Sequence, residues 1–253
     1  SEMCIRDRHG DLTAALSDRS ERRLNHRLES VKLLPPQDMD PNDPHSYGVI
    51  TQTAVSLAEI AAPERSRIFC MAVTNDNVSG ARPSTWSAAI DQAAAGTMNG
   101  DDDEAPKRLF VISAGNVPAE IEYARISRQD DYPAEDPSQA WNVITVGGYT
   151  DLNQISDVGY EDWSCLAGPG ELSPYSRTSV NWAHARAPIK PEVVLEAGNR
   201  ALSPARREVL SLDSLSLLTT SPTTGANAVT AFQATSAATA QAARMVAKLT
   251  AEH

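Results

Sequence analysis

Hydrophobic and polar positions divide the chain into two kinds of segment. Five short runs are rich in branched apolar side chains, as β-strands are, and they cover residues 30–36, 67–73, 108–116, 141–149 and 189–198. Residues 46–62 and 84–98, which separate the first three runs, carry apolar side chains at spacings of three and four, and this predicts helices. Because strands that alternate with helices form parallel sheets covered on both faces, we expect an α/β fold.

Polar and proline-rich segments separate these elements. They lie at residues 35–46, 128–139 and 167–179 and are typical of surface loops within one domain rather than of linkers. A chain of 253 residues with 41% hydrophobic side chains can bury one sizeable core. We therefore expect a single large domain, or most of one.

The segment FQATSAATAQAARMVAKL, residues 232–249, predicts a mostly buried helix. Its polar positions after Ser236 share one stripe: Gln241, Arg244 and Lys248. Ser236 would lie in the first turn, where free N–H groups and the helix dipole favour negative charge near a serine oxygen. Taken alone, the segment is better interpreted as a helix capped by Thr235 or Ser236.

The segment VISAGN, residues 111–116, predicts a buried strand that ends in a turn at Asn116. An asparagine amide at such a turn can donate to the oxygen of a tetrahedral intermediate, a contribution of roughly 3 to 4 kcal/mol. The alternative is a glycine turn in which Asn116 only tolerates a left-handed backbone.

Taken together, these motifs resemble those of the subtilisin-like serine proteases. Residues 234–240 resemble the nucleophile motif Gly-Thr-Ser-x-Ala-x-Pro, with Ala234 and Ala240 in place of glycine and proline. Residues 114–116 match the Ala-Gly-Asn oxyanion motif. Further similar segments follow in family order at residues 142–149, 172–179, 190–198 and 216–220. The resemblance runs from about Glu29 to the C-terminus.

The resemblance implies roles for particular residues. Ser236 would be the nucleophile of a serine endopeptidase, and Asn116 would be the oxyanion donor together with the Ser236 backbone N–H. The Cys70–Thr74 segment would pair with a polypeptide substrate as an added strand. The implied fold is a parallel-sheet, three-layer subtilisin-like fold, truncated at both ends.

The histidine and aspartate of such a triad are not evident in the chain. The family order is Asp, His, Ser, yet neither Asp7 nor Asp11 follows an apolar strand. His9 precedes Lys32 by 32 − 9 = 23 residues. In the family, the histidine motif precedes the lysine of the next strand by roughly thirty residues. We interpret residues 1–9 as a non-native assembly scar and residues 10–253 as a partial peptidase domain.

Composition excludes several other functions. The net charge of −11 makes nucleic acid and anionic membranes poor partners, and no apolar run approaches the roughly 18 residues of a membrane span. The three cysteines form no CxxC pair, so neither a zinc site nor a disulfide framework is expected. The acidic residues 101–104 fit a solvated loop better than a calcium site. We expect no metal and no cofactor.

Two other interpretations stay open. A subtilase-like module that binds peptides without hydrolysing them is suggested by the altered residues Ala234 and Ala240. An α/β hydrolase is disfavoured because the chain has no G-x-S-x-G elbow. The segments around residues 28–36 and 58–74 are similar to a bacterial cytoplasmic branch of subtilases. That similarity implies a cytoplasmic location and an AAA-type ATPase as a partner.

Overall fold

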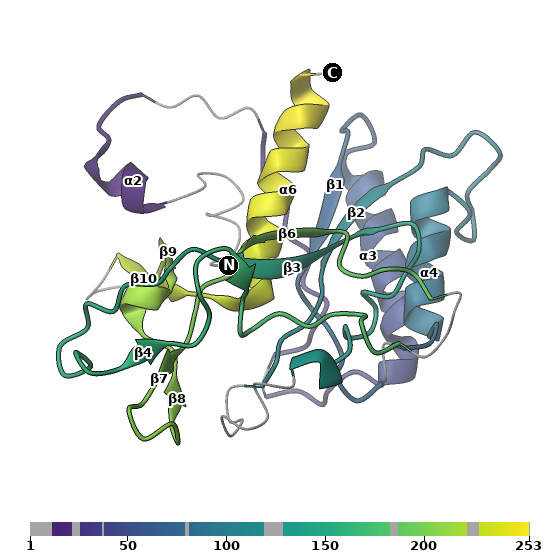
Figure 1. Cartoon of the computed structure of the whole chain (residues 1–253). Helices are drawn as coiled ribbons and strands as arrows, with labels where there is room; N and C mark the ends of the chain where they lie inside the picture. Colours follow the sequence, from purple (N-terminus) through teal and green to yellow (C-terminus); the bar gives the residue numbers. More distant parts are fainter. Residues whose placement is uncertain are drawn as a thin grey trace.

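The structure, a computed structural model, describes most of the chain. The described residues are 12–21, 26–36, 38–78, 81–118, 129–182, 187–221 and 228–252. At their centre lies a sheet with four parallel strands, in which β2 pairs with β1 and β3, and β6 pairs with β3 (Figure 1). The bounds of these strands are β1 Ile68–Met71, β2 Leu109–Ser113, β3 Ile144–Thr150 and β6 Val193–Glu196. The short strand β5, Glu171–Leu172, pairs antiparallel with the end of β3.

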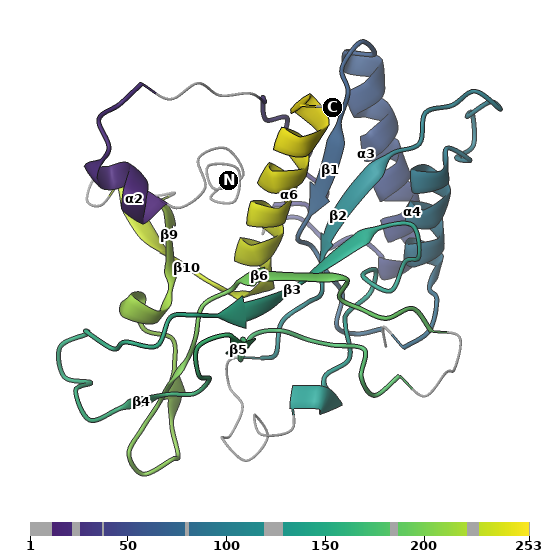
Figure 2. The same ribbon diagram turned by 45° about the horizontal axis from the view of Figure 1, so that its top comes forward.

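Helices cover both faces of this sheet, so the fold has three layers (Figure 2). One face carries α3, Tyr47–Ala61, and α4, Thr85–Ala95, and the other carries α6, Ala234–Glu252. Successive side chains of a strand point to opposite faces. In β2, Phe110 and Ile112 therefore join the core under α3 and α4, whereas Val111 packs against α6. The predicted α/β class with a parallel sheet is confirmed.

Local sequence sets the ends of α4. The Ser84 hydroxyl accepts from the Ser87 N–H, and the Ser87 hydroxyl accepts from the Ser84 N–H, so the pair forms a capping box. The helix ends at Gly96, whose φ of 70° lies in the left-handed region that glycine adopts without strain. These two ends account for the predicted helix at residues 84–98.

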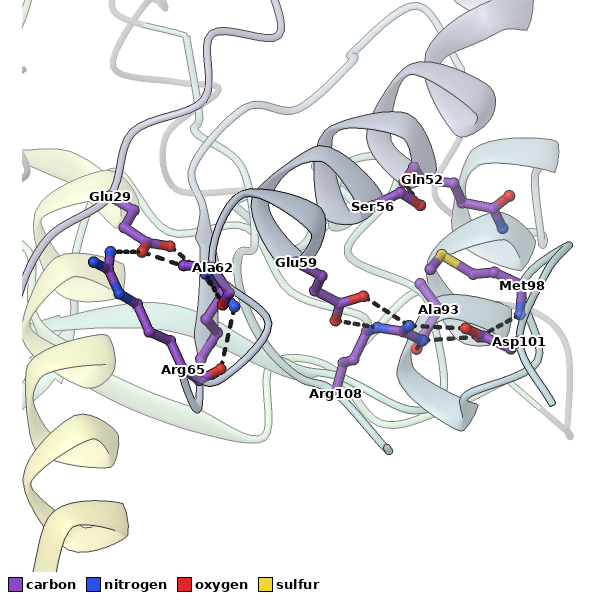
Figure 3. Close-up of polar contacts among 11 residues, drawn as sticks. Glu29, Gln52, Ser56, Glu59, Ala62, Arg65, Ala93, Met98, Asp101 and Arg108 are labelled. Atoms are coloured by element: carbon purple, nitrogen blue, oxygen red, sulfur yellow. Dashed lines mark hydrogen bonds and ion pairs between the residues drawn. The ribbon is translucent and has the colours of Figure 1, made fainter. Parts of the chain in front are cut away.

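The predicted strand at residues 30–36 does not form, and this prediction was wrong. A strand needs a hydrogen-bonded neighbour, yet β1 pairs only with β2 among the described residues. The segment is held instead by Glu29, which accepts from Arg65 at 2.5 Å and from Arg67 at 2.7 Å (Figure 3). It runs outside the sheet after the short helix α2, Leu12–Ser17.

Two small sheets lie beside the main one. The first joins the segments after β3 and β6 and contains β4 Ser164–Cys165, β7 Ala201–Leu202 and β8 Val209–Leu210. The second is a hairpin of β9 Leu217–Thr220 and β10 Val229–Phe232, which leads into α6. The three 3₁₀-helices described are η1 Pro44–Ser46, η2 Gln129–Asp131 and η3 Asp213–Leu215.

Parts of two predicted surface loops are buried, which corrects the sequence interpretation. Residues 134–140 and 173–178 are buried throughout. Polar groups can be buried when they find partners. Here, for example, the Glu135 N–H donates to the Ala114 carbonyl at 2.9 Å, and the Ser176 hydroxyl accepts from the Gly148 N–H at 2.9 Å. Both loops are therefore part of the core around the sheet edge.

Candidate functional site

The nucleophile candidate Ser236 lies in the first turn of α6. The helix begins at Ala234, so Ser236 is its third residue and is partly buried. The alternative interpretation, in which Thr235 or Ser236 only caps the helix, does not fit these bounds, because both residues lie inside the helix. The helix is also less buried than predicted, since Met245 and Leu249 are exposed in its second half.

The backbone turns sharply just before this serine. Ala234 has a φ of 73°, in the left-handed region that is uncommon for a residue with a Cβ. Its N–H donates to the Ala197 carbonyl at 2.7 Å, which ties the turn to the end of β6. Ala234 stands where the resembling motif has glycine, and the turn keeps a glycine-like conformation despite the substitution.

Thr235 holds the side chain of Asn116. The Thr235 N–H and hydroxyl lie 3.0 and 2.6 Å from Asn116 Oδ1, and the Thr235 side chain is fully buried. A backbone N–H can only donate, so the atom that faces it must be the amide oxygen and not the amide nitrogen. Asn116 Nδ2 therefore points elsewhere, and it has no hydrogen-bond partner among the described residues. Asn116 itself is only partly buried.

The two candidate residues lie near each other at the carboxyl ends of the parallel strands. Asn116 follows β2, and Ser236 follows Thr235, which binds the Asn116 side-chain amide. Ligand sites of open α/β sheets lie outside the carboxyl ends of the strands, and this site has that position. The structure thus brings together the residues of two motifs that are 236 − 116 = 120 positions apart.

No proton acceptor is hydrogen-bonded to the Ser236 hydroxyl in the described part of the chain. The Ser236 hydroxyl makes no side-chain hydrogen bond there, and the two described histidines, His26 and His45, do not bind it. The other histidines of the chain, His9, His184 and His253, and the aspartates Asp7 and Asp11 lie outside the described residues.

Glu135 is a buried carboxylate at this site that the sequence did not reveal. It accepts from the Thr74 hydroxyl, and Arg177 Nη2 lies 2.6 Å from its Oε1. Burial raises the pKa of Glu135, while the hydrogen bond from Thr74 and the charge of Arg177 act in the opposite direction. An acidic residue in a polar, proline-rich segment carries no periodic signal, which is why the sequence pointed only to a loop.

Gly115 shows how closely Glu135 approaches the oxyanion turn. The glycine has a φ of 91°, and a Cβ built on it would lie 2.5 to 2.6 Å from atoms of the Glu135 side chain. No L-residue with a side chain fits both the backbone and the space. The Ala-Gly-Asn motif therefore needs its glycine for two separate reasons.

Asp136 ties the segment after β1 to the start of α4. Its carbonyl accepts from the Asn75 N–H at 2.8 Å, and its carboxylate accepts from the Ser84 hydroxyl at 2.5 Å and from Gln139 at 2.8 Å. Burial raises the pKa of Asp136, and no basic side chain pairs with its carboxylate among the described residues. This arrangement fixes the Cys70–Thr74 segment, which the sequence predicted to pair with a substrate.

The described residues contain no group of three or more His, Cys, Asp or Glu side chains arranged to hold a metal ion. Asp101, from the acidic run 101–104, binds Arg108 at 2.9 Å and accepts from the Met98 N–H at 2.8 Å. Its carboxylate is thus committed to an ion pair. In the same part of the chain, none of the helices combines the length and apolar character that a membrane crossing requires.

Fold and site together define a subtilisin-like α/β domain: three layers, a serine in the first turn of α6, and an asparagine at the end of β2. The family model described as Subtilase family matches residues 6–253. The chain belongs to this family of serine peptidases.

Three solved structures with a similar fold are those of proteases or protease-related proteins. Sphericase is 16% identical with a TM-score of 0.47, and the match covers 83% of this chain and 50% of that chain. A lanthipeptide protease is 14% identical with a TM-score of 0.44, and the match covers 85% of this chain and 53% of that chain. The subtilase cytotoxin SubAB is 18% identical with a TM-score of 0.38, and the match covers 84% of this chain and 53% of that chain. A search of curated proteins finds no match. The chain spans about half the length of these solved structures.

Proposed function

We propose that this chain carries the nucleophile half of a subtilisin-type serine endopeptidase. Ser236 is the attacking residue, Asn116 is the oxyanion donor, and the substrate is a polypeptide that lies along the Cys70–Thr74 segment. The general base and its aspartate belong, in this proposal, to sequence outside the chain.

One observation carries this proposal: the fixed orientation of the Asn116 amide. Thr235 occupies Asn116 Oδ1 with two donors, so Nδ2 is left as a donor, and Ser236 directly follows that threonine. Membership of the subtilase family supports the same assignment. A preorganised donor without an internal partner is the arrangement that stabilises developing negative charge.

The proposed reaction follows from these positions. Ser236 Oγ attacks the scissile carbonyl carbon while its proton passes to the base, and the carbonyl oxygen gains negative charge. Asn116 Nδ2 and the Ser236 N–H donate to that oxygen at the start of α6, where the helix dipole is also favourable. Collapse of the intermediate expels the amine with the proton from the base. Water then hydrolyses the acyl-enzyme.

A fluorophosphonate probe tests the nucleophile directly. We expect a full-length protein with the Asp- and His-bearing segments to be labelled at Ser236, as mapped by peptide mass spectrometry, and the Ser236→Ala variant to stay unlabelled. The 253-residue chain should label weakly or not at all, because a serine without a base is a poor nucleophile.

The outcome also separates the alternative function. A full-length protein that binds peptides but takes no label at Ser236 would overturn the peptidase proposal and favour the non-catalytic binding module. An AAA-type ATPase partner and a cytoplasmic location stay predictions from the family branch, which co-purification and cell fractionation would check.

A further inference from the structure

Two charged side chains that the proposed reaction does not use enclose the main chain of Asn116. The Glu135 carboxylate lies by the Asn116 N–H, which lowers its pKa. Arg177 Nε donates to the Asn116 carbonyl at 2.7 Å. The two side chains pair with each other at 2.6 Å, so the carboxylate, the guanidinium and the Asn116 main chain form a ring of contacts.

The ring is nearly closed to solvent. The side chains of Arg177 and Glu135 are 10% and 9% exposed. Further contacts hold each of them in place: the Thr74 hydroxyl donates to Glu135, and the Arg177 guanidinium lies 5.7 Å from the centre of the Tyr132 ring. Arg177 comes from the segment that forms an isolated bridge between Ser176 and Asn116.

A buried ion pair is weak support for stability, because taking both charges out of water costs about as much as their attraction returns. This one contacts the main chain of a single residue, and that residue is the proposed oxyanion donor. Thr235 binds the side chain of Asn116, while Arg177, paired with Glu135, binds its main-chain carbonyl. An oxyanion donor loses much of its effect when it is displaced by a fraction of an ångström.

We infer that the Glu135–Arg177 pair positions Asn116 for transition-state stabilisation, so that both are positioning residues of the peptidase site. The inference rests on the proposed function, because it assumes that Asn116 is the oxyanion donor. Arginine suits this task because its planar fork can reach the carboxylate with one nitrogen and the Asn116 carbonyl with another.

A double-mutant cycle in the full-length protein tests the inference. We expect Arg177→Met to lower kcat for peptide hydrolysis roughly 10- to 100-fold with KM changed less than about twofold, since the lost interaction acts only in the transition state. In the Asn116→Ala background the same substitution should lower kcat by less than about twofold. Arg108→Met removes another buried arginine ion pair, at the opposite end of β2 from Asn116, and is the matched control. It should leave kcat unchanged in both backgrounds at a temperature where all variants are folded.

The outcomes distinguish the two proposals. If Arg177→Met lowers kcat equally in both backgrounds, the pair is merely structural and the inference is overturned, while the proposed function stands. If Asn116→Ala alone leaves kcat unchanged, the proposed function fails and the ring has no catalytic meaning.

Hydrogen exchange tests the ring itself without any activity. In the 253-residue chain, Arg177→Met should speed exchange of the Asn116 amide about tenfold relative to wild type. The Ala114 amide, which donates to the Val146 carbonyl at 2.9 Å in the sheet, is the internal reference and should change little. Equal exchange of the Asn116 amide in both proteins would contradict the ring.

Discussion

Ala234 shows how one residue can keep a conformation that its side chain disfavours. Its φ of 73° costs about 1 to 2 kcal/mol for a residue with a Cβ. The hydrogen bond to the Ala197 carbonyl and the packing of α6 against the sheet hold it there. The sequence therefore lacks the glycine of the resembling motif, but the backbone keeps the conformation that this glycine would adopt.

Replacing this alanine should reveal the strain. Ala234→Gly is expected to leave the free energy of unfolding unchanged or to raise it by up to about 1 kcal/mol, because relief of strain exceeds the entropy that glycine adds to the unfolded chain. Ala247→Gly, in the regular part of α6, should lower it by about 1 kcal/mol. Urea unfolding monitored by circular dichroism measures both. A similar loss at the two positions would contradict strain at Ala234.

Sequence patterns can single out a residue where its motif is local, and they miss what is not local. Asn116 and Ser236 became candidates because each lies in a short run with its own pattern. Glu135 and Arg177 were missed because their significance depends on a contact between two loops. The roles of Asn116 and Ser236 stay predictions.

Among the elements, α3 and β2 are joined by a buried charge network. Arg108, just before β2, lies between Glu59 of α3 at 2.7 Å and Asp101 at 2.9 Å, and it also donates to the Ala93 carbonyl at the end of α4 (Figure 3). The Arg108 side chain is 5% exposed. The two carboxylates raise the pKa of Arg108, and Arg108 in turn lowers the pKa of Asp101.

Removing this arginine should loosen the helical layer. Arg108→Met is expected to lower the free energy of unfolding by about 3 kcal/mol at neutral pH, because it leaves two partly buried carboxylates unpaired. The loss should shrink at acid pH: the Asp101 contribution is present above its ordinary pKa of 3.8 and disappears as the pH falls through the lowered folded value. Urea titrations at several pH values measure this.

The exposed pair of Arg65 with Glu29 provides the comparison. The Arg65 side chain is 47% exposed, so Arg65→Met should shift the unfolding midpoint far less than Arg108→Met. Equal shifts for the two variants would show that burial does not set the strength of these pairs.

Over the whole molecule, acidic groups should make stability depend on pH in an unusual direction. The chain has a net charge of −11, so its compact state is opposed by self-repulsion that weakens as carboxylates protonate. Burial also raises the pKa values of Glu135 and Asp136 above their ordinary values of 4.5 and 3.8. Groups whose folded pKa is raised stabilise the folded state below that pKa and lose this contribution as the pH rises through it.

We therefore expect the free energy of unfolding to increase as the pH falls from neutral through the raised pKa values of Glu135 and Asp136 toward their ordinary values of 4.5 and 3.8. Asp136→Asn should reduce this increase without loss of stability at pH 7, because an amide oxygen can still accept from Ser84 and Gln139. Chemical unfolding at each pH checks both statements. A fall in stability over the same range, or an unchanged slope in Asp136→Asn, would contradict the role of the buried carboxylates.

The sequence by itself determined the elements whose pattern is local. Periodic apolar positions located β1, β2, β3, β6, α3 and α4, and short motifs located Asn116 and the serine in the first turn of α6. These features depend on residues within one or two turns of each other, which a linear pattern records.

Only the tertiary structure decided the rest. Residues 30–36 have the composition of a strand but lack a neighbour to pair with, whereas the polar residues 134–140 are buried because distant backbone groups bind them. The orientation of the Asn116 amide and the ring with Glu135 and Arg177 likewise depend on donors brought from separate loops. Hydrogen bonds between remote segments have no period along the chain, so they become visible only when the chain is folded.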